Sequence, residues 1–296
     1  MLGDAMAERV GLKRSQFRWR VWRRSFRPTD PLARGALALV LFALLTSADA
    51  EAPKGYERLT RAQVLDAVDR AGAAGGRADF YSKDLSNLDL SGVDFKGANL
   101  TAAVLNGSNL SQANLSRCNL TVAFAEGANL SEADLADAVL FSTQLKGSDL
   151  RNANLSRARL IGDLTGANLS GANFTEADAG ADMRNQSMGL MRASVVSARL
   201  VRANLSGANF SKADFSFSDL SGANLTGANL YASNLSGVSF NGTNLTNANL
   251  GESKMIDTDF TGANLTGADL TGAEMRGVQG LSTARLDGIR GLQRAR

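Results

Sequence analysis

The sequence predicts an all-β solenoid, a rod of short stacked strands, and three observations lead to this fold class. From about Phe80 to Met275, about forty consecutive five-residue slots carry a small residue, Asn or Asp, Leu or Phe, Ser or Thr, and often Gly. The apolar centres recur every five residues, whereas an amphipathic helix requires apolar residues at spacings of three and four. No proline follows Pro53, as expected of a chain whose backbone amides donate to neighbouring strands throughout.

Residues 1–50 differ from the rest of the chain in charge and hydropathy. They contain nine Lys or Arg and four Asp or Glu, a net charge of +5, whereas the remaining residues carry a net −2. The apolar run at 35–45 is shorter than the about 20 residues that a membrane span needs. It fits the apolar region of a signal peptide, and Ala48-Asp49-Ala50 fits a small-x-small cleavage site.

An export motif adds to this interpretation. Arg23-Arg24-Ser25-Phe26 resembles the twin-arginine motif, although Arg27 and Pro28 replace its usual following residues. We therefore predict a signal peptide of possible twin-arginine type at 1–50, and a periplasmic or secreted protein without a stable membrane span once the leader is cleaved. An uncleaved membrane anchor is the alternative.

Residues 51–77 are predicted to form a polar linker and a short capping helix. Thr60-Arg61-Ala62-Gln63 is typical of a capping box, and one helix face carries Val64, Leu65 and Val68. These signals place a helix at about 60–71, ended by Gly72. Because the end of a solenoid exposes its core and unpaired strands, we expect this helix to act as a lid. Residues 276–296, with four apolar residues among arginines, are expected to close the C-terminal end.

Each repeat unit within 78–275 fits a short extended segment followed by a corner, as Ala98-Asn99-Leu100-Thr101 illustrates. Side chains of an extended segment alternate, so Ala98 and Leu100 point inward and Asn99 points outward. A small and a large inward residue together fill a narrow core without voids. The outward Asn or Asp can bond the backbone near a bend, and the following Gly accepts the geometry of a corner.

The frame of the repeat slips once, at about 161–190. After Leu160 the next centre is Leu164, one residue early, and the original phase returns by Leu190 and Val195. A missing residue near Ile161 is therefore balanced by an extra one within 180–189. We interpret the slip as a local bulge and a small loop in one continuous rod; a hinge between two half-rods is the alternative.

The repeat A-(N/D)-L-(S/T)-G resembles that of the pentapeptide-repeat proteins. Clean copies are Ala203-Asn204-Leu205-Ser206-Gly207 and Ala263-Asn264-Leu265-Thr266-Gly267. The resemblance covers about two thirds of the chain, and it implies a right-handed quadrilateral β-helix with four units per coil. About forty slots then make about ten coils, a rod on the order of 48 Å long at about 4.8 Å per coil.

The composition excludes most of the residue types on which catalytic sites depend. The chain has no histidine, so histidine triads, general bases and metal ligands are excluded. Cys118 stands alone in the small inward slot, where a packed thiol is expected rather than a nucleophile. Most Asp and Glu occupy outward slots, where stacking alone brings carboxylates together. We therefore predict no catalytic residue, no cofactor, no metal ion and no enzymatic activity.

Apolar residues gather on one side of the first half of the rod. With four units per coil, every twentieth residue stacks in a column, and the slot after the centre gives Tyr81, Thr101, Thr121, Phe141 and Ile161. Elsewhere the outward slots are mostly Ser, Thr, Asn and Gly. We predict a contact patch for a protein partner or for self-association, made of Tyr81, Val104, Val122, Phe124, Val139, Phe141 and Ile161. Unrelated surface residues are the alternative.

We expect an exported, non-enzymatic solenoid that acts as a rigid protein-interaction or structural module. The family resemblance also implies an alternative, because some pentapeptide-repeat proteins imitate duplex DNA and bind type II topoisomerases in the cytoplasm. That function needs a strongly acidic rod, but residues 78–275 hold 20 acids and 13 bases, a net −7. The only acidic ring comprises Asp79, Asp84, Asp89 and Asp94. We expect a protein partner and no nucleic acid.

Overall fold

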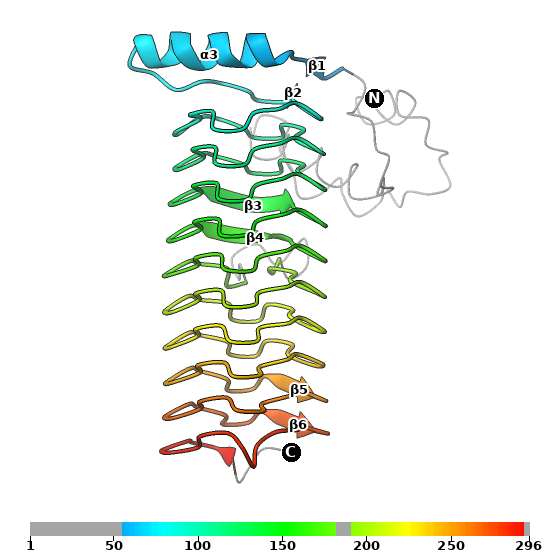
Figure 1. Cartoon of the computed structure of the whole chain (residues 1–296), viewed down its shortest axis with the longest axis vertical. Helices are drawn as coiled ribbons and strands as arrows, with labels where there is room; N and C mark the ends of the chain where they lie inside the picture. Colours follow the sequence, from blue (N-terminus) through cyan, green and yellow to red (C-terminus); the bar gives the residue numbers. More distant parts are fainter. Residues whose placement is uncertain (1–54, 182–190, 293–296) are drawn as a thin grey trace, which may run out of the picture. The chain divides into compact units, whose positions relative to one another are not determined.

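The computed structural model describes residues 55–181 and 191–292. The chain divides into two compact units, Met1–Glu51 and Ala52–Arg296, and all described residues belong to the second. The signal peptide predicted at 1–50 therefore lies outside the described residues, as do residues 182–190 of the predicted slip. Figure 1 shows the described part of the second unit as a stack of coils, with a helix at its N-terminal end.

The coils are joined by parallel pairing between residues that are twenty positions apart. Asn99 pairs with Asn119, and Asn119 pairs with Val139. Donors and acceptors alternate along each side: the Leu100 amide donates to the Asn119 carbonyl at 2.8 Å, and the Asn119 amide donates to the Ala98 carbonyl at 3.0 Å. One coil therefore comprises four five-residue units, and the backbone is satisfied by the coils above and below it.

Most of these pairs are single bridges, and longer strands occur at three places. β1 (Glu57–Arg58) pairs with β2 (Lys83–Asp84), β3 (Val139–Gln144) with β4 (Arg159–Asp163), and β5 (Lys254–Ile256) with β6 (Glu274–Arg276), all in parallel. The register of β3 and β4 shifts at the corner after Phe141, because β4 has one residue fewer there.

Each corner is a tight turn closed by a hydrogen bond between consecutive units. After Leu100, the Ala103 amide donates to the Leu100 carbonyl at 3.0 Å, and Ala102 has a φ of 56°. This left-handed φ explains why the repeat so often has glycine at the equivalent position. The Asn99 side chain accepts from the Thr101 amide at 3.1 Å, which confirms the bond predicted for the outward Asn.

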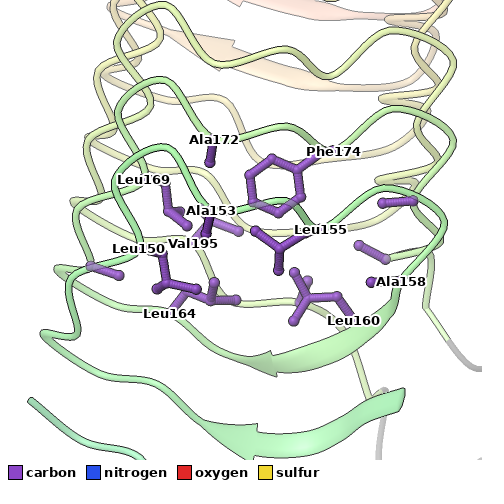
Figure 2. Packing of buried hydrophobic residues seen from close by; sticks show 14 of the residues in the cluster. Leu150, Ala153, Leu155, Ala158, Leu160, Leu164, Leu169, Ala172, Phe174 and Val195 are labelled. Carbon is purple, nitrogen blue, oxygen red and sulfur yellow. The ribbon is translucent and has the colours of Figure 1, made fainter. Parts of the chain in front are cut away.

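The core is a column of small and large side chains that point inward, as the repeat predicts. Leu155 and Ala158 have no exposed surface, and Figure 2 shows both in the interior, with Leu155 beside Phe174. Further along, the rings of Phe240 and Phe260 stack with centroids 5.3 Å apart. Each buried Leu or Phe contributes about 1.5–3 kcal/mol, and this burial offsets the entropy lost in ordering a glycine-rich chain.

An insertion interrupts the repeat without interrupting the ladder of pairs. The spacing shortens to 19 where Gln144 pairs with Asp163, and lengthens to 31 where Asp163 pairs with Ser194. The missing residue near Ile161 was predicted correctly. The return to phase, predicted as one extra residue, is instead an excess of eleven residues (31 − 20) between the paired residues Asp163 and Ser194. One of these eleven residues restores the original phase. The other ten equal two whole repeat units, so they do not change the five-residue phase and cannot be detected from it.

Hydrogen bonds cross this insertion on all four sides of the coil. The amides of the preceding coil donate to carbonyls of the following coil at 2.6–2.7 Å, in the pairs Leu164–Ser194, Leu169–Arg199, Phe174–Asn204 and Ala179–Asn209. The coils on either side of the insertion are thus bonded like any other neighbours. This pairing favours one continuous rod over a hinge between two half-rods.

The N-terminal helix α3 (Arg61–Ala73) lies where the sequence predicts a helix. The Thr60 amide donates to Gln63 Oε1 at 2.8 Å, and the Gln63 amide donates to Thr60 Oγ1 at 3.3 Å, which completes the predicted capping box. Val64 is fully buried in the core, and Leu65 and Val68 pack partly buried against it. The helix includes Gly72 rather than ending there.

At the C-terminal end of the rod, Leu281, Leu286 and Ile289 also pack partly buried against the core.

Candidate interaction surface

The predicted column of outward residues lies on one corner of the rod, where the chain leaves the side that ends with Phe80. Successive coils stack closely at this corner: the Ala102 amide donates to the Thr121 carbonyl at 2.9 Å, and the Val122 amide donates to the Phe141 carbonyl at 2.8 Å. The structure thus aligns the whole predicted column, namely Tyr81, Thr101, Thr121, Phe141 and Ile161.

Three of the seven predicted patch residues are buried. Val104 is 2% exposed, Val122 6% and Ile161 3%. Val104 pairs with Phe124 in the next coil, and Ile161 pairs with Phe141 in the preceding coil, so these two smaller side chains are stacked on larger ones. Coils about 4.8 Å apart leave no space for solvent between stacked apolar side chains. The prediction that these three residues form an open contact surface is therefore wrong.

The other four predicted residues reach the surface and form the contact patch, which comprises Tyr81, Phe124, Val139 and Phe141. Tyr81 is 54% exposed, and the other three are partly exposed. The Arg159 guanidinium carbon lies 5.6 Å from the centroid of the Phe141 ring, a cation–π contact. A substitution of Phe141 would therefore lower stability as well as any association, and Tyr81 is the cleaner position to test.

Two further exposed aromatic side chains, Phe217 (70%) and Tyr231 (42%), lie in the second half of the rod and outside the predicted patch. Phe217 occupies a slot in which the repeat often has Gly, and Tyr231 a slot that usually has Ser or Thr. Across the insertion, the bonds Ala181–Ser211 and Lys212–Tyr231 place Tyr231 in the column of Tyr81. The column read from the sequence ended at Ile161, where the spacing changes, and so missed it.

Cys118 is a packed thiol, as the sequence predicts. It is fully buried, and its Sγ donates to the Phe95 carbonyl at 3.1 Å. Burial raises the pKa of the thiol to about 12, so the sulfur stays uncharged and unreactive at neutral pH.

Within 55–181 and 191–292, no group of three or more His, Cys, Asp or Glu side chains could hold a metal ion. No helix in these same residues is long and apolar enough to cross a membrane.

The ionised groups of the rod form exposed pairs between and within coils. Arg157 Nε lies 2.8 Å from Asp137 Oδ1 in the preceding coil, and Arg151 Nη2 lies 2.7 Å from Asp149 Oδ2. The hydrogen bond from Arg157 holds the pKa of Asp137 below its usual value, and Arg151 does the same for Asp149. Both carboxylates are stabilised in their charged form, which suits surface ion pairs better than proton transfer.

Stability is expected to fall in acid and to stay level through neutral pH. Folding lowers the pKa values of four carboxyl groups, namely those of Asp89, Asp137, Asp149 and Asp269. These ionised groups therefore contribute fully to the stability of the fold at pH values above the ordinary pKa of 3.8. The contribution is lost as the pH falls through their pKa values in the folded protein. With no histidine, no side chain of ordinary pKa titrates between about pH 5 and 8. Melting temperatures measured from about pH 2 to 8 check this. Asp137→Asn should flatten the acid side of the profile, and an unchanged profile would contradict the assignment.

Known proteins share this repeat. A family model described as Pentapeptide repeats matches residues 84–121, 125–157, 153–185, 190–227, 198–237, 223–262 and 243–278. Among solved structures, the chain is similar to HetL, a pentapeptide repeat protein involved in heterocyst differentiation regulation in the cyanobacterium Nostoc sp. strain PCC 7120. The two are 30% identical over 78% of this chain and 96% of HetL, with a TM-score of 0.47.

Two other similar structures are more distant. Rfr23 from the cyanobacterium Cyanothece 51142 is 29% identical over 38% of this chain and 90% of its own, with a TM-score of 0.34. QnrB1, a plasmid-mediated fluoroquinolone resistance protein, is 18% identical over 60% of this chain and 88% of its own, with a TM-score of 0.38. The comparison with curated proteins found no match.

Proposed function

The chain belongs to the pentapeptide-repeat family, and from this premise we propose that it is an exported, non-enzymatic rod that binds a protein partner through its contact patch. Members of the family fold as right-handed quadrilateral β-helices and generally serve as structural or interaction modules. We extend the proposal to a rod of about ten coils whose N-terminal end is closed by α3, which buries Val64 in the core.

The observation that carries the proposal is the solvent-accessible apolar surface at one corner. The outward slots elsewhere are mostly Ser, Thr, Asn and Gly, whereas the contact patch has two Phe, one Val and one Tyr. Tyr81 is 54% exposed, and tyrosine is among the residues that carry most binding energy in protein interfaces. The patch is held on paired coils, so a partner would find it pre-organised.

A photo-crosslinking amino acid at position 81 tests the proposal in cells that make the full chain. We expect a crosslinked protein adduct from position 81 and none from Gln112, which is exposed on a different corner. The adduct is expected in the cell-envelope or secreted fraction. Equal crosslinking at both positions, or none at either, would show that the corner is not a binding surface.

Export makes a separate prediction about processing. Both tryptophans, Trp19 and Trp22, lie in the proposed signal peptide, while all three tyrosines follow it. Cleavage after Ala50 would therefore leave a mature protein with tyrosine fluorescence and no tryptophan fluorescence. Intact-mass measurement of protein from its native host gives the same answer independently. Native protein that begins before residue 35 would be incompatible with cleavage.

The alternative, a cytoplasmic topoisomerase-binding DNA mimic, has less support from the charge distribution. The net charge of residues 78–275 is only −7, and residues 220–251 contain no charged side chain. A rod that imitates DNA needs negative charge along its length, because the phosphates dominate the field of a duplex. Recovery of the full chain in the cytoplasmic fraction would nevertheless favour this alternative over export.

A further inference from the structure

Phe217 is an aromatic side chain in a conformation and an environment that both disfavour it. Its φ is 61°, in the left-handed region that bulky residues rarely adopt, and 70% of its surface is exposed. The ring lies over Gly237 in the next coil: a Cβ added to Gly237 would be 2.6 Å from Phe217 Cδ1. Other corners hold non-glycine residues such as Val122 at a similar φ, so this conformation belongs to the repeat. What sets Phe217 apart is a large, exposed ring in a slot that usually has Gly, and this points to a binding role.

Tyr231 repeats this arrangement at the neighbouring corner. It is 42% exposed, and its ring lies against Gly251 in the next coil, where an added Cβ would be 3.3 Å from Tyr231 Cδ2. The segment from Tyr231 to Gly237 forms one side of a single coil. The ring of Tyr231 stands at the start of this segment, and the ring of Phe217 covers its end. Two exposed aromatic rings therefore flank one side of the rod.

The surface between the rings is polar and has no excess of either charge. Asn234 lies at its centre and donates from Nδ2 to Asp214 Oδ1 at 3.1 Å. Asp214 is in turn paired with Arg192 at 3.1 Å, and Lys254 on the next coil is in register with Glu274. Opposite charges thus alternate along this side, so it has no net field that would favour a charged ligand over an uncharged one.

We propose that this side of the rod binds an uncharged polysaccharide, with sugar rings stacked on Phe217 and Tyr231 and sugar hydroxyls bonded to the amide of Asn234. Sugars present apolar C–H faces together with many hydroxyl groups, which suits separated aromatic rings with polar side chains between them. A protein interface needs a contiguous apolar core, whereas the two rings here stand at opposite ends of one side with the polar Asn234 between them. This site is separate from the contact patch and does not depend on it.

Native affinity electrophoresis of the full chain, with hydroxyethylcellulose or laminarin in the gel, tests the proposal. Phe217→Gly and Tyr231→Ser each restore the usual residue of the repeat, so both variants should fold at least as well as the original chain. We expect at least one of the two polysaccharides to retard the chain, and the double variant to bind about tenfold more weakly. The matched control is Gln112→Gly, which makes the same change to Gly at an exposed corner position of left-handed φ in the first half of the rod and should bind unchanged.

Three results would overturn the proposal: no retardation by either polysaccharide, equal retardation of the double variant, or equal loss in the Gln112→Gly control. Formation of a protein complex that depends on Phe217 and Tyr231, with no retardation by polysaccharide, would assign the rings to a protein partner instead. Circular dichroism and melting temperature of each variant show whether a loss of binding reflects the missing ring or an altered fold.

Discussion

Replacing Leu225 with aspartate is expected to lower the free energy of unfolding by about 3–5 kcal/mol. Leu225 is a centre of the repeat with no exposed surface, and its amide donates to the Asn244 carbonyl at 2.7 Å. The aspartate carboxyl would enter an apolar column without a partner, and the burial of the leucine would be lost as well. Urea unfolding followed by circular dichroism measures the change.

Asn224→Asp is the matched control, because it places the same carboxyl group one residue away on the outside. The structure already contains this arrangement: Asp134 pairs with Asn114 above it and accepts from Asn154 Nδ2 at 2.9 Å. We expect a change of at most about 1 kcal/mol, the value of one hydrogen bond. If both substitutions cost the same, the assignment of inward and outward slots is wrong.

Gly162→Ala is expected to destabilise the rod by about 1–3 kcal/mol, or by more if the pairing of β3 and β4 breaks. The added Cβ would lie 2.4 Å from the Thr143 carbonyl oxygen, and it would also approach the Thr143 amide nitrogen at 3.3 Å. These are backbone atoms of a paired strand, so they cannot move aside as the end of a flexible side chain can. Thermal and urea unfolding of the variant provide the measurement.

Gly147→Asn is the control for this prediction, and it adds a larger side chain. Gly147 has a φ of 63° with nothing within 4 Å of an added Cβ, and Asn152 adopts a φ of 59° at the next corner. Asparagine tolerates this conformation, so a change below about 0.5 kcal/mol is expected. A Gly147→Asn effect as large as that of Gly162→Ala would show that the close approach to Thr143 is not the cause.

The coil geometry could be predicted because the repeat constrains every unit in the same way. The alternation of Ala98, Asn99 and Leu100 decides which side chains point inward, and that assignment holds in the structure. The length of the insertion could not be predicted in this manner. A five-residue period records only a phase, and an excess of eleven residues has the same phase as an excess of one. Pairing partners such as Asp163 and Ser194 carry the missing information.

The candidate surfaces were harder to predict, because pointing outward does not mean being exposed. Whether Val104 meets solvent depends on Phe124, twenty residues later, and on how closely the coils stack. Phe217 and Tyr231 stand out only when they are compared with the Gly and Ser or Thr of other units. Their rings lie on Gly237 and Gly251, which the predicted spacing of twenty residues already identifies as neighbours, but the exposure of the rings does not follow from that spacing.

Because the pairing is continuous across the insertion, the rod holds residues of one column at fixed distances from one another. Tyr81 and Tyr231 belong to one column, and the pairs between them step through seven coils, about 34 Å at about 4.8 Å each. Both tyrosines therefore lie at the same corner at a fixed separation, although the chain between them has lost one residue and gained eleven. A ligand or complex that reaches both positions would bind them in one event, and its avidity would depend on matching this span.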